Sequence, residues 1–146
     1  MSLTSLSSET VHASTVAIGD RAVLIGGRSG QGKSDLALRL IDRGALLVSD
    51  DYTFVRRVEG RLLASSPEAI KGKIEMRGVG LLDMPTAQDI AIALFVDLDR
   101  PPERLPVAED RRTFAGVELP VIGLSALEAS APIKVEAALR LIGLPV

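Results

Sequence analysis

The chain has 146 residues, of which 47% are hydrophobic and only 3% aromatic, and its formal net charge is −2. This length suits a single domain, residues 1–146, with an aliphatic core that buries roughly 68–70% of the surface of the unfolded chain. Charges of both signs are mixed along the sequence, which argues against nucleic-acid binding because that function needs a clustered basic face. The absence of cysteine excludes disulfides and thiolate metal sites.

The first ten residues are polar and rich in serine. They contain no cationic stretch followed by an apolar one, so we expect a loose segment at residues 1–10 and no secretory signal. No apolar run along the chain approaches the length of a membrane span. The sequence therefore predicts a cytosolic protein with no membrane partner, and its hydrophobic excess favours a homo-oligomer.

Two apolar runs, residues 16–18 and 22–25, flank Gly19-Asp20 and predict an antiparallel hairpin. The second run leads through a glycine-rich stretch into residues 33–43. Leucines recur there largely along one side and Gly44 follows, which predicts a helix.

The rest of the chain alternates short apolar runs with turns. We predict strands at 45–48, 52–58, 61–64, 90–96 and 117–122, and a closing helix at 132–141. Glu59-Gly60 marks a second hairpin turn, and the three prolines in residues 97–107 make that segment a loop. This order predicts an α/β fold with a mixed sheet flanked by helices.

Residues 27–34 read Gly-Arg-Ser-Gly-Gln-Gly-Lys-Ser and fulfil the phosphate-binding pattern G-x-x-x-x-G-K-[S/T]. Small residues let backbone N–H groups surround phosphate oxygens, Lys33 reaches the β and γ phosphates, and the hydroxyl of Ser34 ligates Mg²⁺. The helix N-terminus adds its partial positive charge. A glycine-rich turn that binds nothing would need the lysine, the hydroxyl and both flanking elements to be coincidental, so we predict a nucleoside triphosphate site.

Asp50 and Asp51 follow the predicted strand at 45–48. In an open α/β sheet the carboxyl ends of strands line the ligand crevice. A carboxylate there can hold Mg²⁺ or accept a proton from an attacking hydroxyl, and an adjacent pair offers one residue for each role. The alternative, an Asp-Asp pair that merely opens a turn, is less attractive beside a phosphate loop.

Several charged residues elsewhere have more than one interpretation. Residues 71–83 mix charges with three glycines, so this segment is either a loop that wraps a ligand with Glu75 and Arg77 or a surface hairpin with solvated charges. His12 is the single histidine, and such a residue is more often packed or exposed than catalytic. The arginines that follow the prolines, Arg104, Arg111 and Arg112, are either phosphate partners or solvated loop residues.

Three motifs in order, residues 26–34, 46–51 and 74–83, together with Val11-His12, resemble the catalytic domain of HPr kinase/phosphorylase over roughly residues 11–107. The resemblance implies a fold similar to phosphoenolpyruvate carboxykinase. It also implies a bacterial, hexameric enzyme that uses ATP and Mg²⁺ to phosphorylate a serine of the phosphocarrier protein HPr.

The resemblance assigns roles by position. The nucleotide would be bound by the phosphate loop with the metal-side Asp50, that is by Gly27, Arg28, Ser29, Gly30, Gln31, Gly32, Lys33, Ser34 and Asp50. Ser34 and Glu75 would bind Mg²⁺, and residues 74–83 would form the family's catalytic loop. The catalytic residues would be His12, Lys33, Asp51 as proton acceptor, and Arg104 in Glu103-Arg104-Leu105.

The sequence also departs from the family pattern. It begins almost at the catalytic domain, so we expect the family's N-terminal domain, and regulation through it, to be absent. The loop after Asp83 is short, and the segment tied to the phosphorylase reaction has only a partial counterpart at residues 131–135. The short form resembles proteobacterial versions whose phosphocarrier systems serve regulation.

The resulting hypothesis is in-line transfer of the γ-phosphoryl group of Mg-ATP to a protein serine, mostly by positioning and charge neutralisation, with the reverse phosphorylase reaction less well supported. Two alternatives stay open. One is an ATP-binding sensor with weak or no catalysis, and the other is a small-molecule kinase with the same phosphate loop.

Overall fold

The computed structural model describes residues 7–106 and 110–145, and residues 1–6 and 107–109 and Val146 lie outside this description. Its strands are β1 (Ser8–Val11), β2 (Ala13–Ile18), β3 (Arg21–Gly26), β4 (Leu46–Ser49), β5 (Thr53–Val58), β6 (Arg61–Ser65), β7 (Lys73–Met76), β8 (Gly80–Asp83), β9 (Ile90–Asp97), β10 (Arg111–Phe114) and β11 (Val117–Gly123). The helices are α1 (Lys33–Asp42), α2 (Ala131–Ile142) and a single 3-10 turn η1 (Glu68–Ile70).

A mixed sheet of nine strands organises the molecule, and β7 and β8 form a separate hairpin. The centre of the sheet has the order β11-β9-β3-β2-β4, with β9 parallel to both β3 and β11 and with β2 antiparallel to β3 and β4. The first residues of β9 pair instead with β6, from which the sheet continues through β5 to β1. The α/β class predicted from the sequence is confirmed.

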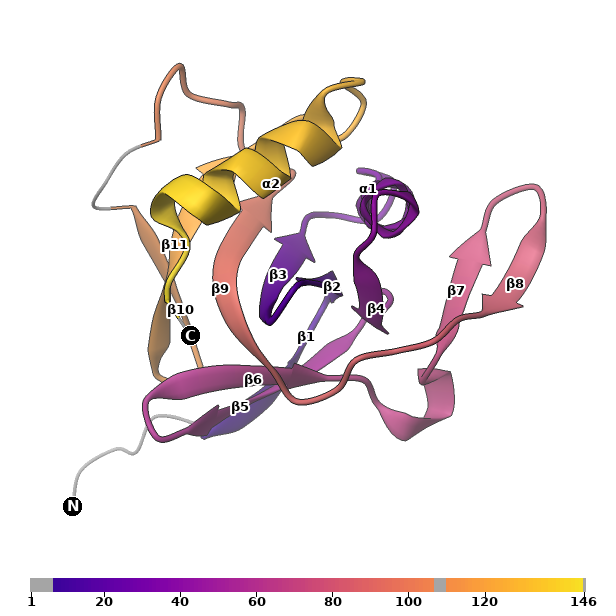
Figure 1. Cartoon of the computed structure of the whole chain (residues 1–146), viewed down its shortest axis with the longest axis horizontal. Coiled ribbons are helices and arrows are strands. Elements are labelled where there is room, and N and C mark those ends of the chain that lie inside the picture. Colours follow the sequence, from indigo (N-terminus) through magenta and orange to yellow (C-terminus); the bar gives the residue numbers. More distant parts are fainter. Residues whose placement is uncertain (1–6, 107–109, 146) are drawn as a thin grey trace.

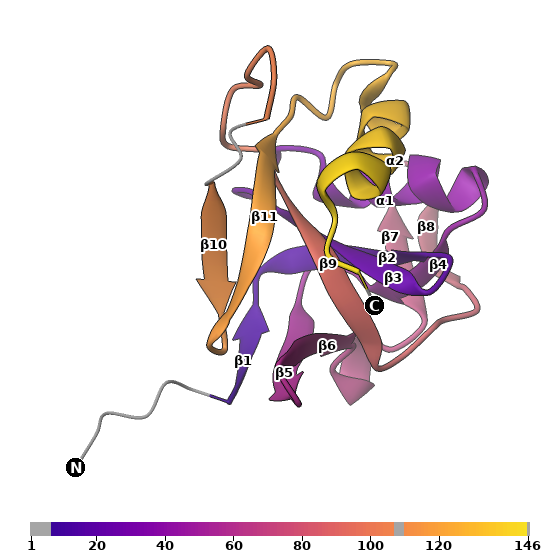
Figure 2. The same ribbon diagram turned by 60° about the vertical axis from the view of Figure 1, so that its left-hand side comes forward.

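Both helices cover the same face of the central strands, and the strands β1, β5 and β6 lie on the opposite side (Figure 1). Figure 2 shows the same division, with β10 and β11 beside β1. The carboxylate of Glu9 on β1 accepts a hydrogen bond from the backbone N–H of Ala115, at the β10–β11 turn. The face of the central strands opposite the helices is therefore covered by other strands of the same curved sheet.

The core is divided by the central strands into two aliphatic layers, because successive side chains of a strand point to opposite faces. Val23 and Ile25 of β3 pack in the layer that includes Leu36 of α1 and Leu139 of α2. Leu24 belongs to the other layer, which includes the side chains of Val55, Leu62, Phe95 and Leu119. The near absence of aromatic residues predicted such an aliphatic core.

The two hairpins predicted from sequence are confirmed, although the first is longer at both ends: β2 with β3, and β5 with β6. Of the segment predicted as a loop at residues 97–107, Asp97 still belongs to β9, the rest is a loop as far as Pro106, and Val107 lies outside the described residues. No helix in the described part of the chain is long and apolar enough to cross a membrane.

Two strands differ from the expectation. The loose segment expected at residues 1–10 includes Ser8 to Thr10, which belong to β1 and pair with β5. Arg111 and Arg112, expected on a loop, lie on β10 and pair with β11. Both are edge strands, with mostly partly exposed residues in β1 and mostly exposed ones in β10, so neither sequence shows a continuous apolar pattern.

Candidate active site

The candidate site lies at one edge of the sheet, where β3, β4, β9 and β11 all end. These strands share one direction, because β9 is parallel to β3 and β11 while β3 and β4 are both antiparallel to β2. The phosphate loop follows β3, and Asp50 and Asp51 follow β4. Between these two segments lies the start of β2, which carries Ser14. The topology therefore gathers the polar motifs at one place.

The phosphate loop has the backbone geometry that its glycines allow. Gly30 and Gly32 have φ values of 89° and 93°, in the left-handed region, and Gly32 is the N-cap of α1 without a side chain to cap it. The Nζ of Lys33 is folded over the loop and donates to the carbonyl oxygens of Gly27 at 2.8 Å and Arg28 at 3.3 Å. The backbone N–H groups at the start of α1 and the ammonium group of Lys33 thus lie close together at the loop.

The carboxylate of Asp99, two residues after the end of β9, is hydrogen-bonded to the phosphate loop. Both oxygens of Asp99 accept the backbone N–H of Arg28 at 3.1 Å, and the guanidinium Nε of Arg28 donates to the same carboxylate at 3.1 Å. These bonds hold the pKa of Asp99 below its ordinary value, with the Arg28 backbone N–H as the main cause, and partial removal from water opposes the shift. Asp99 is therefore a fixed negative anchor of the loop.

A chain of hydrogen bonds connects the phosphate loop to both aspartates. The hydroxyl of Ser34 donates to Oδ1 of Asp50 at 2.6 Å, and the hydroxyl of Ser14 donates to the same oxygen at 2.9 Å. Ser14 Oγ in turn accepts the backbone N–H of Asp51 at 3.0 Å. The carboxylate of Asp50 and the backbone of Asp51 are thus held relative to the loop by two serines.

The imidazole ring of His12 contacts the carboxylate of Asp51. Nε2 of His12 lies 2.9 Å from Oδ1 of Asp51, and it is the donor because an ionised carboxylate only accepts. The ring of Tyr52 stacks on that of His12 with centroids 5.0 Å apart and 25° between the planes. The fold thus brings into contact two residues that the sequence resemblance named separately, His12 between β1 and β2 and Asp51 after the end of β4.

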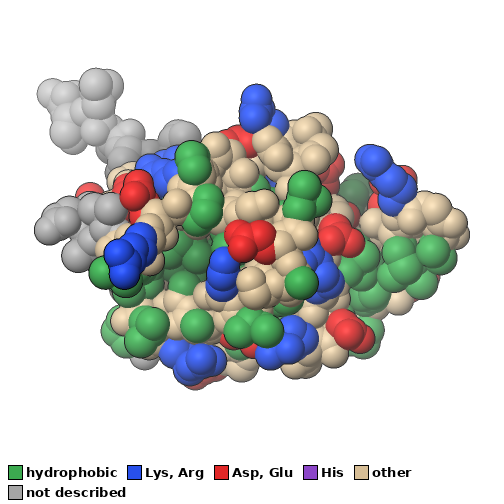
Figure 3. All heavy atoms as spheres, turned by 90° about the horizontal axis from the view of Figure 1, so that it is seen from above, with side chains coloured by type: hydrophobic (Ala, Val, Ile, Leu, Met, Phe, Trp, Pro, Cys, Tyr) green, Lys and Arg blue, Asp and Glu red, His purple; other side chains and the backbone are tan. Residues whose placement is uncertain are grey.

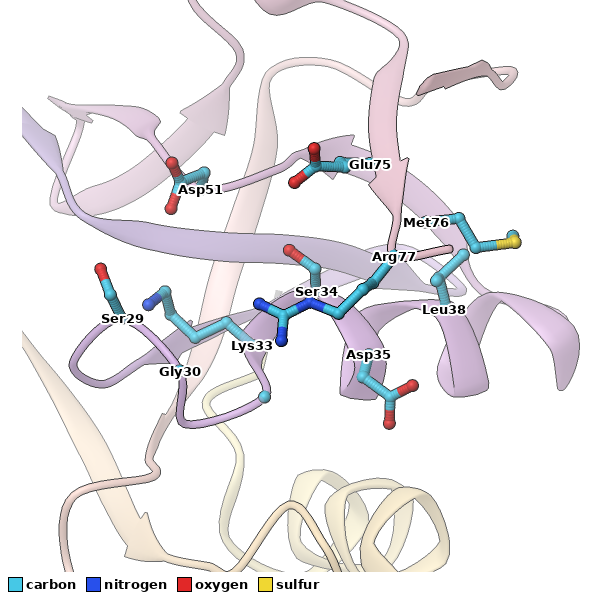
Figure 4. A pocket seen from close by; sticks show the side chains of 11 residues that line it. Ser29, Gly30, Lys33, Ser34, Asp35, Leu38, Asp51, Glu75, Met76 and Arg77 are labelled. Atoms are coloured by element: carbon cyan, nitrogen blue, oxygen red, sulfur yellow. The ribbon is translucent and has the colours of Figure 1, made fainter. Parts of the chain in front are cut away.

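The hollow beside the phosphate loop has a volume of about 400 Å³ (Figure 4). Its lining comes from the loop and α1, the end of β4, and the hairpin: Ser29, Gly30, Gly32, Lys33, Ser34, Asp35, Leu38, Asp51, Glu75, Met76 and Arg77. In Figure 4 the guanidinium of Arg77 extends from the hairpin toward Lys33 and Ser34. This segment is therefore a hairpin, as in the second of the two interpretations of residues 71–83. Its residues Glu75, Met76 and Arg77 also line the hollow.

The residues named from sequence divide into four groups by position. Lys33, Ser34, Asp51 and Glu75 line the hollow, as do Ser29, Gly30 and Gly32. His12 and Asp50 do not line the hollow but hydrogen-bond to the lining residues Asp51 and Ser34, while the loop residues Gly27, Arg28 and Gln31 do not line it. Arg104 is not brought to this hollow and lines a second one between the loop after β9 and α2.

The oxygen atoms around Ser34 fit magnesium. Among the described residues there is no group of three or more histidine or carboxylate side chains that could hold a metal by itself. Magnesium at nucleotide sites needs only one or two protein carboxylates, because phosphates and water complete its octahedron. The hydroxyl of Ser34, the carboxylate of Asp50 and the Glu75 side chain in the same hollow supply oxygen ligands of that kind.

Three contributors to the site were missed by the sequence reasoning. Tyr52 directly follows Asp51 and Ser14 lies two residues after His12, yet an exposed tyrosine and a serine within a strand carry no pattern of their own. Asp99 could have been found from its place just after an apolar strand, since acidic residues at strand carboxyl ends are candidates for the ligand crevice.

Fold and site together define a phosphate-loop domain of the α/β class. The model of the HPr serine kinase C-terminal domain family matches residues 4–140, and the chain belongs to this family. The match extends beyond residues 11–107 in both directions, and so includes β10, β11 and most of α2.

Curated relatives carry the same family name. The chain is 41% identical over 84 residues to the HPr kinase/phosphorylase of Clostridium tetani, covering 58% of this chain and 28% of that protein. It is 36% identical over 124 residues to the HPr kinase/phosphorylase of Caldanaerobacter subterraneus, covering 76% of this chain and 41% of that protein. The chain thus spans about two fifths or less of these relatives.

A solved structure has the same fold over nearly its full length. The Hpr(Ser) kinase/phosphatase from Coxiella burnetii superimposes with a TM-score of 0.76 at 29% sequence identity, and the alignment covers 90% of this chain and 94% of that one. The similarity therefore includes both the sheet and the helices described above.

Proposed function

We propose that this chain is an ATP-dependent serine kinase that acts on an HPr-type phosphocarrier protein. The observation that carries the proposal is the hydrogen-bonded chain from Ser34 through Asp50 and Ser14 to Asp51 and His12. It joins the loop that would hold the phosphates to a carboxylate that faces the hollow. Relatives named HPr kinase/phosphorylase support the choice of substrate.

In this proposal the segment 27–34 binds ATP. The backbone N–H groups at the start of α1 and the ammonium of Lys33 neutralise phosphate charge, and Arg77 adds a second cation from across the hollow. Ser34 and Glu75 hold Mg²⁺, with Asp50 on the same side. The ion, when bound, neutralises the charge that develops on the phosphate oxygens.

Asp51 accepts the proton of the substrate serine. As that proton leaves, the serine oxygen forms a bond to the γ-phosphorus and the bond to the bridging oxygen of ADP breaks. His12 donates to Oδ1 of Asp51, which orients the carboxylate while leaving its other oxygen free for the serine hydroxyl. The half-exposed position of Asp51 suits a substrate that is itself a protein.

The test is incubation of the protein with Mg-ATP and an HPr-type carrier, followed by intact and peptide mass spectrometry. We expect phosphate on one serine. Asp51→Asn should lower the rate at least about 100-fold, which is the smallest usual contribution of a general base, with ATP affinity within about twofold. Lys33→Ala should lose both transfer and ATP binding. Asp20→Asn, in the exposed β2–β3 turn, is the matched control and should keep full activity.

Three outcomes would contradict the proposal. Full activity of Asp51→Asn would remove the assigned base. ATP binding without transfer to any carrier would favour the sensor. Turnover with a metabolite hydroxyl and none with a carrier would identify a small-molecule kinase. Arg104 stays a prediction, and Arg104→Ala in the same assay tests it.

A further inference from the structure

Ser14 connects the two aspartates although no motif includes it. We propose that Ser14 is a positioning residue, which holds Asp50 and Asp51 in place beside the phosphate loop. Its side chain is 0% exposed, and β2, on which it lies, separates β3 and the phosphate loop from β4 and the aspartates. The inference rests on the proposed kinase function and adds a residue to the same site.

The hydroxyl of Ser14 acts as both a hydrogen-bond donor and a hydrogen-bond acceptor. It donates its proton to Oδ1 of Asp50 at 2.9 Å and accepts the backbone N–H of Asp51 at 3.0 Å. One side chain therefore sets the orientation of one carboxylate and the backbone position of the next. A residue that only filled a space in the strand would need neither contact.

The backbone of Asp51 needs such support. Its φ is +69°, and the N–H of Tyr52 donates to the carbonyl oxygen of Asp50 at 2.8 Å, which closes a three-residue γ-turn of the rare form with a positive central φ. A residue in such a conformation costs about 1–3 kcal/mol and persists only where its surroundings define it. The bond to Ser14 and that from Ser49 Oγ to the carbonyl of Tyr52 define this turn from both ends.

Asp50 depends on Ser14 in a second way. Its carboxylate is only 8% exposed, and Oδ1 accepts from Ser34 and Ser14. Ser34 belongs to the loop that would rearrange its contacts around a nucleotide. Ser14 is fixed in a buried strand, so its bond holds the Asp50 carboxylate independently of the loop.

Loss of the Ser14 hydroxyl would therefore affect the aspartates more than the nucleotide. The side-chain hydrogen bonds of Ser14 go to the two aspartates, and its hydrogen-bonded link to the phosphate loop runs through Asp50 and Ser34. Thr15, the next residue of β2, provides a matched comparison. Its buried hydroxyl hydrogen-bonds to the Thr53 hydroxyl at 2.8 Å and not to an aspartate, and Thr53 keeps a second bond to the carbonyl oxygen of Ala13.

The experiment compares Ser14→Ala, Ser14→Thr and Thr15→Val in the full chain. Steady-state phosphorylation of the carrier gives kcat and the KM for ATP, and a fluorescent ATP analogue gives nucleotide affinity. We expect Ser14→Ala to lower kcat about 10- to 100-fold with nucleotide affinity within about twofold. Ser14→Thr, which keeps a hydroxyl, should recover most of kcat, and Thr15→Val should leave it within about twofold of the parent.

A second measurement does not depend on activity. His12 is the one histidine of the chain, so its ring gives a single set of NMR signals, and it bonds directly to Asp51. Ser14→Ala should shift these signals, while Thr15→Val should leave them in place. Unchanged His12 signals, or a kcat within twofold of the parent in Ser14→Ala, would overturn the inference. An inactive parent protein would overturn the kinase proposal instead, and the NMR comparison would still test Ser14.

Discussion

Asp99 shows how a single side chain outside the recognised motifs can govern a phosphate loop. Its carboxylate accepts the backbone N–H of Arg28 with both oxygens and also binds the guanidinium of the same residue. Hydrogen bonds to an ionised acceptor are roughly twice as strong as neutral ones. We infer that Asp99 keeps the first half of the loop in its binding shape before a nucleotide arrives.

Asp99→Asn should weaken nucleotide binding about threefold to tenfold with a smaller effect on kcat, because an amide keeps one acceptor oxygen and loses the charge. Titration with a fluorescent ATP analogue measures this. Asp89→Asn is the matched control, since it breaks an exposed ion pair with Arg56 at the opposite end of β9. Equal affinities of Asp99→Asn and the parent would show that the loop holds its shape unaided.

The anchor should also respond to acid. The Arg28 backbone N–H is the main reason that the pKa of Asp99 lies below its ordinary value of 3.8. A carboxyl with a lowered pKa in the folded state contributes stability that is complete above the unfolded value and is lost as pH falls through the folded one. We therefore expect this contribution to be constant from neutral pH down to about 4 and to disappear below it, as measured by unfolding of the parent against Asp99→Asn.

The β7–β8 hairpin is the element on which the outer wall of the hollow depends. A two-stranded hairpin is marginally stable by itself, and this one extends beyond the main sheet (Figure 1). Ile74, which is fully buried in the layer that includes Leu36 and Ala37, fastens it to the core. Its neighbours Glu75 and Arg77 reach the hollow. Burial of Ile74 therefore positions Glu75 and Arg77 at the hollow.

Ile74→Ala should lower the free energy of unfolding by about 2–5 kcal/mol and reduce phosphoryl transfer, because the cavity lets the hairpin move away from the phosphate loop. Denaturant unfolding and the carrier assay test the two effects. Val79→Ala, at the exposed hairpin turn, should change stability by less than about 0.5 kcal/mol. Transfer at the parent rate in a folded Ile74→Ala protein would exclude a role for hairpin position.

At the level of the whole molecule, exposed apolar side chains favour self-association. The mean hydropathy of the chain is +0.28, and Val79, Leu81, Leu127 and Leu141 are all more than half exposed. Figure 3 shows hydrophobic side chains at the end of the molecule where the hairpin lies in Figure 1, and acidic and basic groups interspersed over the same face. Among the described residues on this face, basic side chains are not clustered as nucleic-acid binding would require.

We expect a homo-oligomer, with six copies as the number that the family resemblance implies. Light scattering at micromolar concentration should give a mass that is a multiple of the 15.4 kDa chain. Dilution should lower the mass if the exposed leucines form the contacts, because association then depends on concentration. A mass of one chain across the micromolar range would contradict this expectation.

The sequence alone determined the local features. The phosphate loop, the two hairpins and both α-helices follow from short patterns, namely glycines with Lys33 and Ser34, turn pairs such as Glu59-Gly60, and apolar periodicity. The resemblance named His12 and Asp51 as separate catalytic residues, and the structure places His12 Nε2 within hydrogen-bond distance of the Asp51 carboxylate. The edge strands β1 and β10 were missed, because edge strands with exposed or partly exposed residues have no continuous apolar pattern.

The tertiary structure decided which distant residues meet. Ser14 lies 36 positions before Asp50 along the chain and Asp99 lies 71 after Arg28, and no local pattern encodes either separation. The order of strands brings β2 between β3 and β4, and so places Ser14 between the phosphate loop and the aspartates. Local propensity acts over a few residues, whereas strand order depends on burial of the whole aliphatic core, and only the folded sheet sets these contacts.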